Sequence, residues 1–210
     1  MTTYEIPFLF DGDEKAGLTI ALAHGAGAPM DSPFMNDMAG ALAAGGLRVA
    51  RFEFPYMAKR RVDGKKRGPD RAAVLLPFLG EIVRQLGGPE NLILGGKSTG
   101  GRMTSMVADD LGVAWLVCLG YPFHPPGKPE SLRTEHLASL VTPALICHGT
   151  RDPSGKPDEI AGYDLSKAIG LHWVEDGEHD FKPRKSSGRT QSQNIIEAAG
   201  AISDFARKLN

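Results

Sequence analysis

Short apolar runs alternate along the chain with longer stretches in which apolar residues recur every three or four positions. Runs that are rich in β-branched and aromatic residues and end at turn-forming residues are typical of strands. By this criterion we expect strands within residues 4–10, 17–25, 47–54, 91–96, 115–122, 144–149 and 171–176. The runs after position 47 are almost continuously apolar, as is typical of parallel strands that are buried on both faces.

Helical periodicity occupies the intervals between these runs. Ser32 can cap a first helix that Gly45 can end. Further helices are expected over 70–86, where Pro77 predicts a kink or a later start, and over 101–112. The last helix has the clearest pattern, because its apolar residues form a single face. These residues are Ile195, Ala199, Ile202, Ala206 and Leu209.

The alternation of strands with helices predicts an α/β fold with a mostly parallel, doubly wound sheet and helices on both faces. The chain has 210 residues, which is enough for a substantial core, so we interpret residues 1–210 as a single domain. In sheets of this kind, sites form beyond the carboxyl ends of the strands. Residues capable of chemistry should therefore follow the strands closely.

Charge and composition exclude several classes of partner. The formal net charge is -1, so no general attraction to nucleic acid or to anionic membranes is expected. No apolar segment approaches the ~18 residues that span a bilayer, and the first residues show no signal-peptide pattern. Cys118 and Cys147 lie within apolar runs, where we expect buried free thiols in a reducing compartment. The sequence therefore favours a cytoplasmic protein with no membrane partner.

The segment NLILGGKSTGGRM places one serine between glycines at the end of an apolar run. Gly96, Ser98 and Gly100 match the pattern G-x-S-x-G between a predicted strand and a predicted helix. Glycines on either side leave room for a strained turn that lifts the hydroxyl clear of the sheet. Ser98 is therefore a candidate nucleophile, although a tight turn in which serine is merely small would look the same.

A serine nucleophile needs a base, and the base needs an acid that orients it. His179 directly follows the last predicted strand, and Asp152 follows the strand before it. Asp176 and Asp180 are rival acids, but residues so close to His179 on one loop rarely present the right geometry. The six histidines and two cysteines show no metal-ligand spacing, so neither a metal nor a cofactor is expected.

An oxyanion formed at Ser98 would need backbone N–H donors. Residues 24–32, HGAGAPMDS, follow the second predicted strand, and their small side chains allow N–H groups to face inward. Candidate donors are the N–H groups of Ala26, Gly27 and Thr99. On its own the same segment would be read as a plain strand-to-helix loop.

Two charged features remain open at this stage. Arg102 lies in the first turn after Ser98, where a helix dipole disfavours a cation, so we expect an ion pair with Glu53. The segment from Lys59 to Arg71 holds seven basic residues and only two aspartates. It could attract an anionic substrate or nucleic acid at the rim of a site, but a solvated, mobile loop is more typical of such a charge run.

The motifs together resemble the α/β-hydrolase superfamily over nearly the whole chain. They are LAHGAGAPMDSPFM, RFEFPYM, GGKSTGGRM, GYPFHPPGKPE and ICHGTRDP. The order Ser98, Asp152, His179 is the order of that superfamily, and the segment from His24 resembles an esterase oxyanion loop. In detail the chain is similar to a small bacterial dienelactone-hydrolase-like group. That group is related to a hydrolase-like domain in a subunit of an animal histone acetyltransferase complex. Dienelactone hydrolases proper use a cysteine, whereas this position holds Ser98.

This resemblance and the residues imply a serine hydrolase that acts on a carboxylic ester or thioester of a small acyl substrate. The chain is too short for a large cap domain, and the proline-rich residues 121–137 are the only candidate lid. The alternative is a non-catalytic binding or scaffold protein on a hydrolase fold. The two functions differ in geometry, because a decayed enzyme would lose the hydrogen bond between Ser98 and His179.

Overall fold

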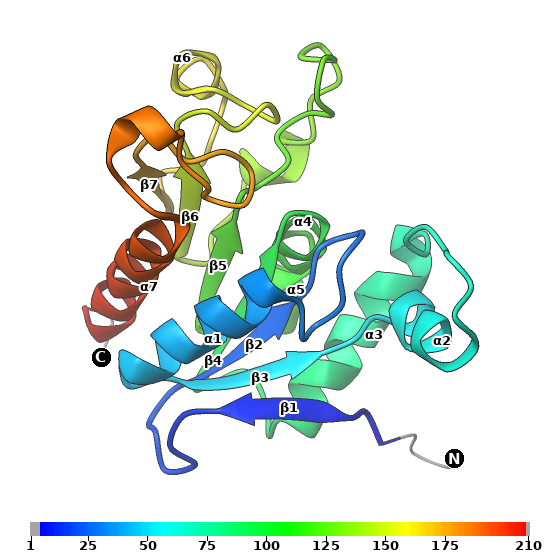
Figure 1. The fold of residues 1–210 in the computed structure, drawn as a ribbon. Helices are drawn as coiled ribbons and strands as arrows, with labels where there is room; N and C mark the ends of the chain where they lie inside the picture. The colour runs from blue at the N-terminus through cyan, green and yellow to red at the C-terminus, as the bar shows by residue number, and fades with distance from the viewer. Residues whose placement is uncertain (1–4, 209–210) are drawn as a thin grey trace.

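Residues 5–208 are described in the computed structural model, and they form a sheet of seven strands (Figure 1). The strands are β1 (Phe8–Asp11), β2 (Thr19–Ala23), β3 (Arg48–Phe52), β4 (Leu92–Lys97), β5 (Trp115–Leu119), β6 (Ala144–Gly149) and β7 (Ile169–Val174). Their order across the sheet is β1-β3-β2-β4-β5-β6-β7. β1 is antiparallel to β3, and every other neighbouring pair is parallel.

Helices cover both faces of this sheet. They are α1 (Pro33–Ala44), α2 (Pro55–Asp63), α3 (Ala72–Gln85), α4 (Thr99–Ser105), α5 (Ala108–Leu111), α6 (Pro157–Ile160) and α7 (Gln191–Arg207), with short 3-10 turns at Glu135–Leu137 and Lys185–Ser187. One core layer lies between the sheet and the pair α1 and α7, and the other lies under α2, α3, α4 and α5. Successive β2 residues enter opposite layers, which explains why the strand is apolar throughout.

The predicted fold class is confirmed: the sheet is mostly parallel, helices cover both faces, and residues 5–208 form no large cap. Residues 144–149 form β6 with the predicted bounds. Ser32 and Gly45 flank α1 as predicted, but the side chain of Ser32 makes no capping hydrogen bond. The strand predicted over residues 4–10 corresponds to β1, which begins at Phe8. Tyr4, the first residue of that prediction, lies outside the described part of the chain. Leu209 of the predicted last helix also lies outside it.

One helical prediction needs refinement and another needs correction. α3 begins at Ala72, shortly after Asp70, and continues through Pro77, so the helix does not start after that proline. The helix predicted over 101–112 is split into α4 and α5, since Met106 and Val107 form a turn between them. None of the described helices combines the length and apolarity that crossing a membrane requires.

The basic segment is also more ordered than expected. Its first residues belong to α2, which ends at Gly64 in a left-handed conformation. A mobile loop is therefore the wrong description of residues 59–63. The helix packs inward through Tyr56 and Met57, which are both buried. Lys59, Arg60 and Arg61 are therefore carried by a helix rather than by a loop.

Candidate active site

The turn at Ser98 is strained, as the glycine pattern indicated. Ser98 joins β4 to α4 with φ 51° and ψ -117°, a region that residues with a side chain rarely adopt. A Cβ on Gly96 would lie 2.5 Å from the carbonyl carbon of Gly100. A Cβ on Gly100 would lie 2.6 Å from the carbonyl oxygen of His24. Only glycine at both positions lets α4 approach the sheet closely enough to form this turn.

Ser98, His179 and Asp152 come together at the carboxyl ends of β4, β7 and β6. Nε2 of His179 lies 2.8 Å from Oγ of Ser98, and Nδ1 lies 2.7 Å from Oδ2 of Asp152. The loop after β7 is held over the end of β6 by a hydrogen bond from the N–H of Arg151 to the carbonyl oxygen of Gly177 (2.9 Å). The sheet order thus brings together groups that are 81 and 27 residues apart along the chain.

The two rival acids have other partners. Oδ1 and Oδ2 of Asp176 both accept hydrogen bonds from Arg184, each at 2.7 Å. Asp180 forms an ion pair with Lys97, with 3.0 Å between Oδ1 and Nζ. Asp152 is therefore the carboxylate that contacts His179.

Burial and hydrogen bonding act in opposite directions on Asp152. The side chain is fully buried, which by itself disfavours the charged form. The hydrogen bond with His179 and the N–H of Ser154, 2.8 Å from Oδ1, favour that form and outweigh burial. The pKa of Asp152 therefore lies below its ordinary value, and the carboxylate is ionised near neutral pH.

The predicted oxyanion loop faces the same cavity as the nucleophile. A cavity of about 580 Å³ is lined by Ala26, Gly27, Ser98 and His179, together with residues near the start of α1. Thr99 is the first residue of α4, so its N–H has no partner within the helix. The candidate nucleophile, the candidate base and two of the three residues that could supply N–H donors thus line one cavity, and Asp152 is buried behind His179.

His24 and Tyr56, which the sequence did not single out, hold this loop in place. His24 is buried, its Nε2 accepts the N–H of Phe54 at 3.1 Å, and its Nδ1 lies 2.6 Å from the carbonyl oxygen of Gly25. Burial lowers the pKa of His24, so the ring is neutral and can accept at one nitrogen. The hydroxyl of Tyr56 lies 3.2 Å from the carbonyl oxygen of Ala26. The only sequence signal was the position of His24 directly after a strand.

Lys97 is the second residue that the sequence did not single out. It precedes Ser98, lines the same cavity and is almost completely buried. Burial lowers the pKa of its ammonium group, while the charge of Asp180 opposes that change. The ion pair between Lys97 and Asp180 ties β4 to the loop that carries His179. A lysine next to the nucleophile was visible in the sequence, but its partner was not.

The ion pair predicted between Arg102 and Glu53 is wrong. Glu53 accepts hydrogen bonds from Nε (2.9 Å) and Nη2 (2.5 Å) of Arg61 instead. The physical reason is the sheet order, because β2 lies between β3, which precedes Glu53, and β4. Within residues 5–208, Arg102 forms no ion pair. Burial of His136 lowers the pKa of its imidazole, and the nearby charge of Arg102 lowers that pKa further.

The two cysteines are free and buried, as predicted. Across residues 5–208, no three His, Cys, Asp or Glu side chains are grouped so that they could hold a metal ion. The cavity at Ser98 is lined instead by a serine and a histidine that are hydrogen-bonded to each other, and by the glycine-rich segment that holds the candidate N–H donors. These groups suit transfer of an acyl group to and from oxygen.

Comparison with known proteins agrees with this architecture. The structure is similar to a dienelactone hydrolase from Anabaena variabilis (20% identity, TM-score 0.70, covering 95% of this chain and 89% of that one). It is also similar to a monoacylglycerol lipase from Paleococcus ferrophilus (14%, TM-score 0.71, 99% and 100%). A third similar structure is an alpha-beta serine hydrolase homologue from Coxiella burnetii (19%, TM-score 0.69, 96% and 98%). At these identities the likeness shows the fold.

The family itself follows from the sequence. A family model described as an alpha/beta hydrolase domain matches residues 16–207, which is most of the chain. That match, the fold and the hydrogen bond between Ser98 and His179 together support a hydrolase. The chain belongs to the alpha/beta hydrolase domain family.

Proposed function

We propose that the protein is a serine hydrolase of carboxylic esters or thioesters, with Ser98, His179 and Asp152 as its catalytic triad. The observation that carries this proposal is the continuous chain of hydrogen bonds from Ser98 through His179 to Asp152, at 2.8 and 2.7 Å. Two of the similar structures are named for a lactone and an acylglycerol, which are both carboxylic esters.

The reaction begins at the strained turn. Oγ of Ser98 attacks the acyl carbonyl carbon while Nε2 of His179 takes the hydroxyl proton, and Asp152 stabilises the resulting imidazolium. The N–H groups of Ala26 and Thr99, with Gly27 beside them, donate to the oxyanion of the tetrahedral intermediate. His179 then gives its proton to the leaving alcohol or thiol as the bond to it breaks. Water then attacks the acyl carbon while His179 takes its proton, the bond from that carbon to Oγ of Ser98 breaks, and His179 returns the proton to Oγ as the carboxylic acid leaves.

The open cavity suggests a small acyl substrate. None of the residues that line the cavity comes from the proline-rich segment 121–137, so that segment does not form a lid in this structure. No step of the proposed reaction calls on a cofactor. An acyl acceptor other than water would use the same residues, and analysis of products with added alcohols separates hydrolysis from transfer.

Reaction with a fluorophosphonate probe tests the proposal. Wild type should be labelled rapidly, and Ser98→Ala and His179→Ala should not, because the probe requires an activated serine. Ser105→Ala is a matched control: Ser105 also lies 2.8 Å from a histidine, Nε2 of His136, but it is buried outside the cavity. This variant should label like wild type. If folded wild type is not labelled, the proposal fails and the non-catalytic alternative takes its place. An ester and thioester panel then separates the two substrate classes.

A further inference from the structure

A second cavity, larger than the one at Ser98, lies on the other side of the loop at 24–32. Its volume is about 860 Å³, and the two cavities have no lining residue in common. Ala26 and Gly27 line the cavity at Ser98, whereas Met30 lines the second one. The volume falls within the range of about 300–1,000 Å³ that is typical of small-molecule sites. The proposed hydrolysis makes no use of this space.

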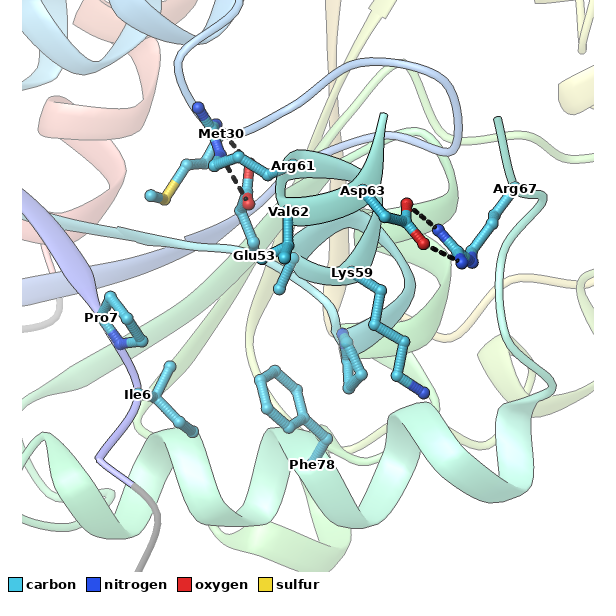
Figure 2. A pocket seen from close by; sticks show the side chains of 12 residues that line it. Ile6, Pro7, Met30, Glu53, Lys59, Arg61, Val62, Asp63, Arg67 and Phe78 are labelled. Atoms are coloured by element: carbon cyan, nitrogen blue, oxygen red, sulfur yellow. Dashed lines mark hydrogen bonds and ion pairs between the residues drawn. The ribbon is translucent and has the colours of Figure 1, made fainter. Parts of the chain in front are cut away.

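The walls of the second cavity are mostly apolar. Figure 2 shows Phe78 of α3 facing α2, with Ile6 and Pro7 of the N-terminal segment at one end. Val62 of α2 also lines the cavity, and its side chain is 89% exposed. A mostly apolar cavity that a solvent-exposed residue lines is suited to a hydrocarbon chain that enters from solvent.

The cations around this cavity come from the basic segment. Residues 59–71 carry seven basic side chains and two aspartates, a net charge of +5, in a chain whose net charge is -1. Arg61 and Arg67, which line the cavity, are already paired with Glu53 and Asp63. Lys59 also lines it, and within the described chain it has no ion pair. Figure 2 shows Lys59 extending from α2 toward α3. Its ammonium group is thus available to an anion at the cavity.

We propose that this second cavity binds a long-chain carboxylate, with the hydrocarbon chain along Ile6, Met30 and Phe78 and the carboxylate on Lys59. Charge selects the head group, because Lys59 is a lining cation without an ion pair, whereas the lining carboxylates Glu53 and Asp63 are already paired with Arg61 and Arg67. The apolar walls select the chain. The site is separate from Ser98, so it does not depend on the proposed hydrolysis.

Calorimetric titration of oleate, below its micelle concentration, into Ser98→Ala protein tests the proposal. We expect saturable binding of one oleate per chain. Lys59→Glu should weaken it by about tenfold or more, the scale of a lost charge-assisted hydrogen bond. Val62→Glu should weaken it by a similar factor, because it places a negative charge in the apolar wall next to the ligand. Both residues are exposed, so the variants should unfold at the wild-type temperature. Lys66→Glu is the matched control, because Lys66 lies in the same segment but does not line the cavity. It should bind oleate like the parent.

Three outcomes would overturn the proposal. The first is no saturable binding of oleate. The second is binding that survives both Lys59→Glu and Val62→Glu, which would place oleate elsewhere, for example at Ser98. The third is equally tight binding of oleyl alcohol, which would remove the role of the carboxylate. Because the titration uses Ser98→Ala protein, its result is independent of whether Ser98 is catalytic.

Discussion

At the scale of single residues, Asp152 decides which nitrogen of His179 carries the proton. An ionised carboxylate can only accept hydrogen bonds, so Nδ1 of His179 must donate to it over 2.7 Å. Nε2 is then left as an acceptor for the hydroxyl of Ser98, 2.8 Å away. The lowered pKa of Asp152 keeps this arrangement in place near neutral pH.

Replacing Asp152 with Asn should abolish most of the activity without unfolding the protein. The Asn amide can donate to Nδ1, which would move the proton to Nε2 and leave no acceptor for Ser98. By analogy with other triads, kcat should fall about ten-thousandfold. Glu178→Gln is the control, because Glu178 is exposed and adjacent to His179 but is not hydrogen-bonded to it. Steady-state kinetics on an ester substrate would contradict the prediction if both variants lost activity equally.

The same carboxylate should make stability depend on acidity. Because the pKa of Asp152 is lower in the folded state than in the unfolded state, its ionised form favours folding. That contribution is present above the unfolded pKa of about 3.9 and is lost as pH falls through the folded pKa. The difference in unfolding free energy between wild type and Asp152→Asn should therefore be smaller at about pH 3 than at about pH 6. Urea unfolding of both proteins at both pH values measures this difference in free energy. The same difference at both pH values would refute the prediction.

At the scale of elements, the site depends on how closely α4 approaches β2 and β4. The helix is short, and its two glycines at positions 100 and 101 are both buried against the sheet. A Cβ at Gly100 would lie within 2.8 Å of two backbone oxygens, those of Ala23 and His24. Backbone atoms cannot move aside as a side chain can, so any larger residue must displace the helix.

Gly100→Ala should therefore destabilise the protein and disable Ser98. Displacement of packed elements typically costs about 1–3 kcal/mol, and the turn at Ser98 would lose its geometry. Gly40→Ala is the matched control, because Gly40 lies in α1 with no atom within 4 Å of the added Cβ. That change should stabilise by about 0.5–1 kcal/mol. Urea unfolding and fluorophosphonate labelling would disprove the argument if Gly100→Ala matched wild type in both.

At the scale of the whole molecule, the two cysteines lie in the two core layers on opposite faces of the sheet. Cys118 of β5 lies in the layer under α4, and its Sγ is 3.4 Å from the carbonyl oxygen of Gly101. Cys147 of β6 lies in the layer under α1 and α7, with its Sγ 3.9 Å from the carbonyl oxygen of Ala198. Both side chains are fully buried. Burial raises the pKa of Cys118 and raises that of Cys147 to about 12.

Both thiols should react with N-ethylmaleimide at one common, slow rate in the native protein. A buried, protonated thiol reacts only when its layer opens, and the shared sheet should make the two layers open together. Mass spectrometry of the two cysteine peptides over time measures both rates, and protein unfolded in urea should take up two labels at once. Two clearly different rates in the native state would show that the layers open separately.

The sequence by itself determined the features that depend on near neighbours in the chain. The apolar runs predicted the strands, and the glycines around Ser98 predicted its strained turn. These signals are local, because side-chain alternation and turn geometry act over a few residues. The order of motifs also predicted that Asp152 and His179 follow adjacent strands, although it left Asp176 and Asp180 open as acids.

The tertiary structure alone decided which charged groups meet. Arg61 of α2 pairs with Glu53, which lies between β3 and α2, whereas Arg102 follows β4, which β2 separates from β3. Asp180 pairs with Lys97 because the loop after β7 reaches back to the end of β4. The ion pair between Asp180 and Lys97 depends on the order of strands across the sheet, and a local sequence pattern does not specify that order. The tertiary structure also decided which acid contacts His179, because Asp176 pairs with Arg184 and Asp180 pairs with Lys97.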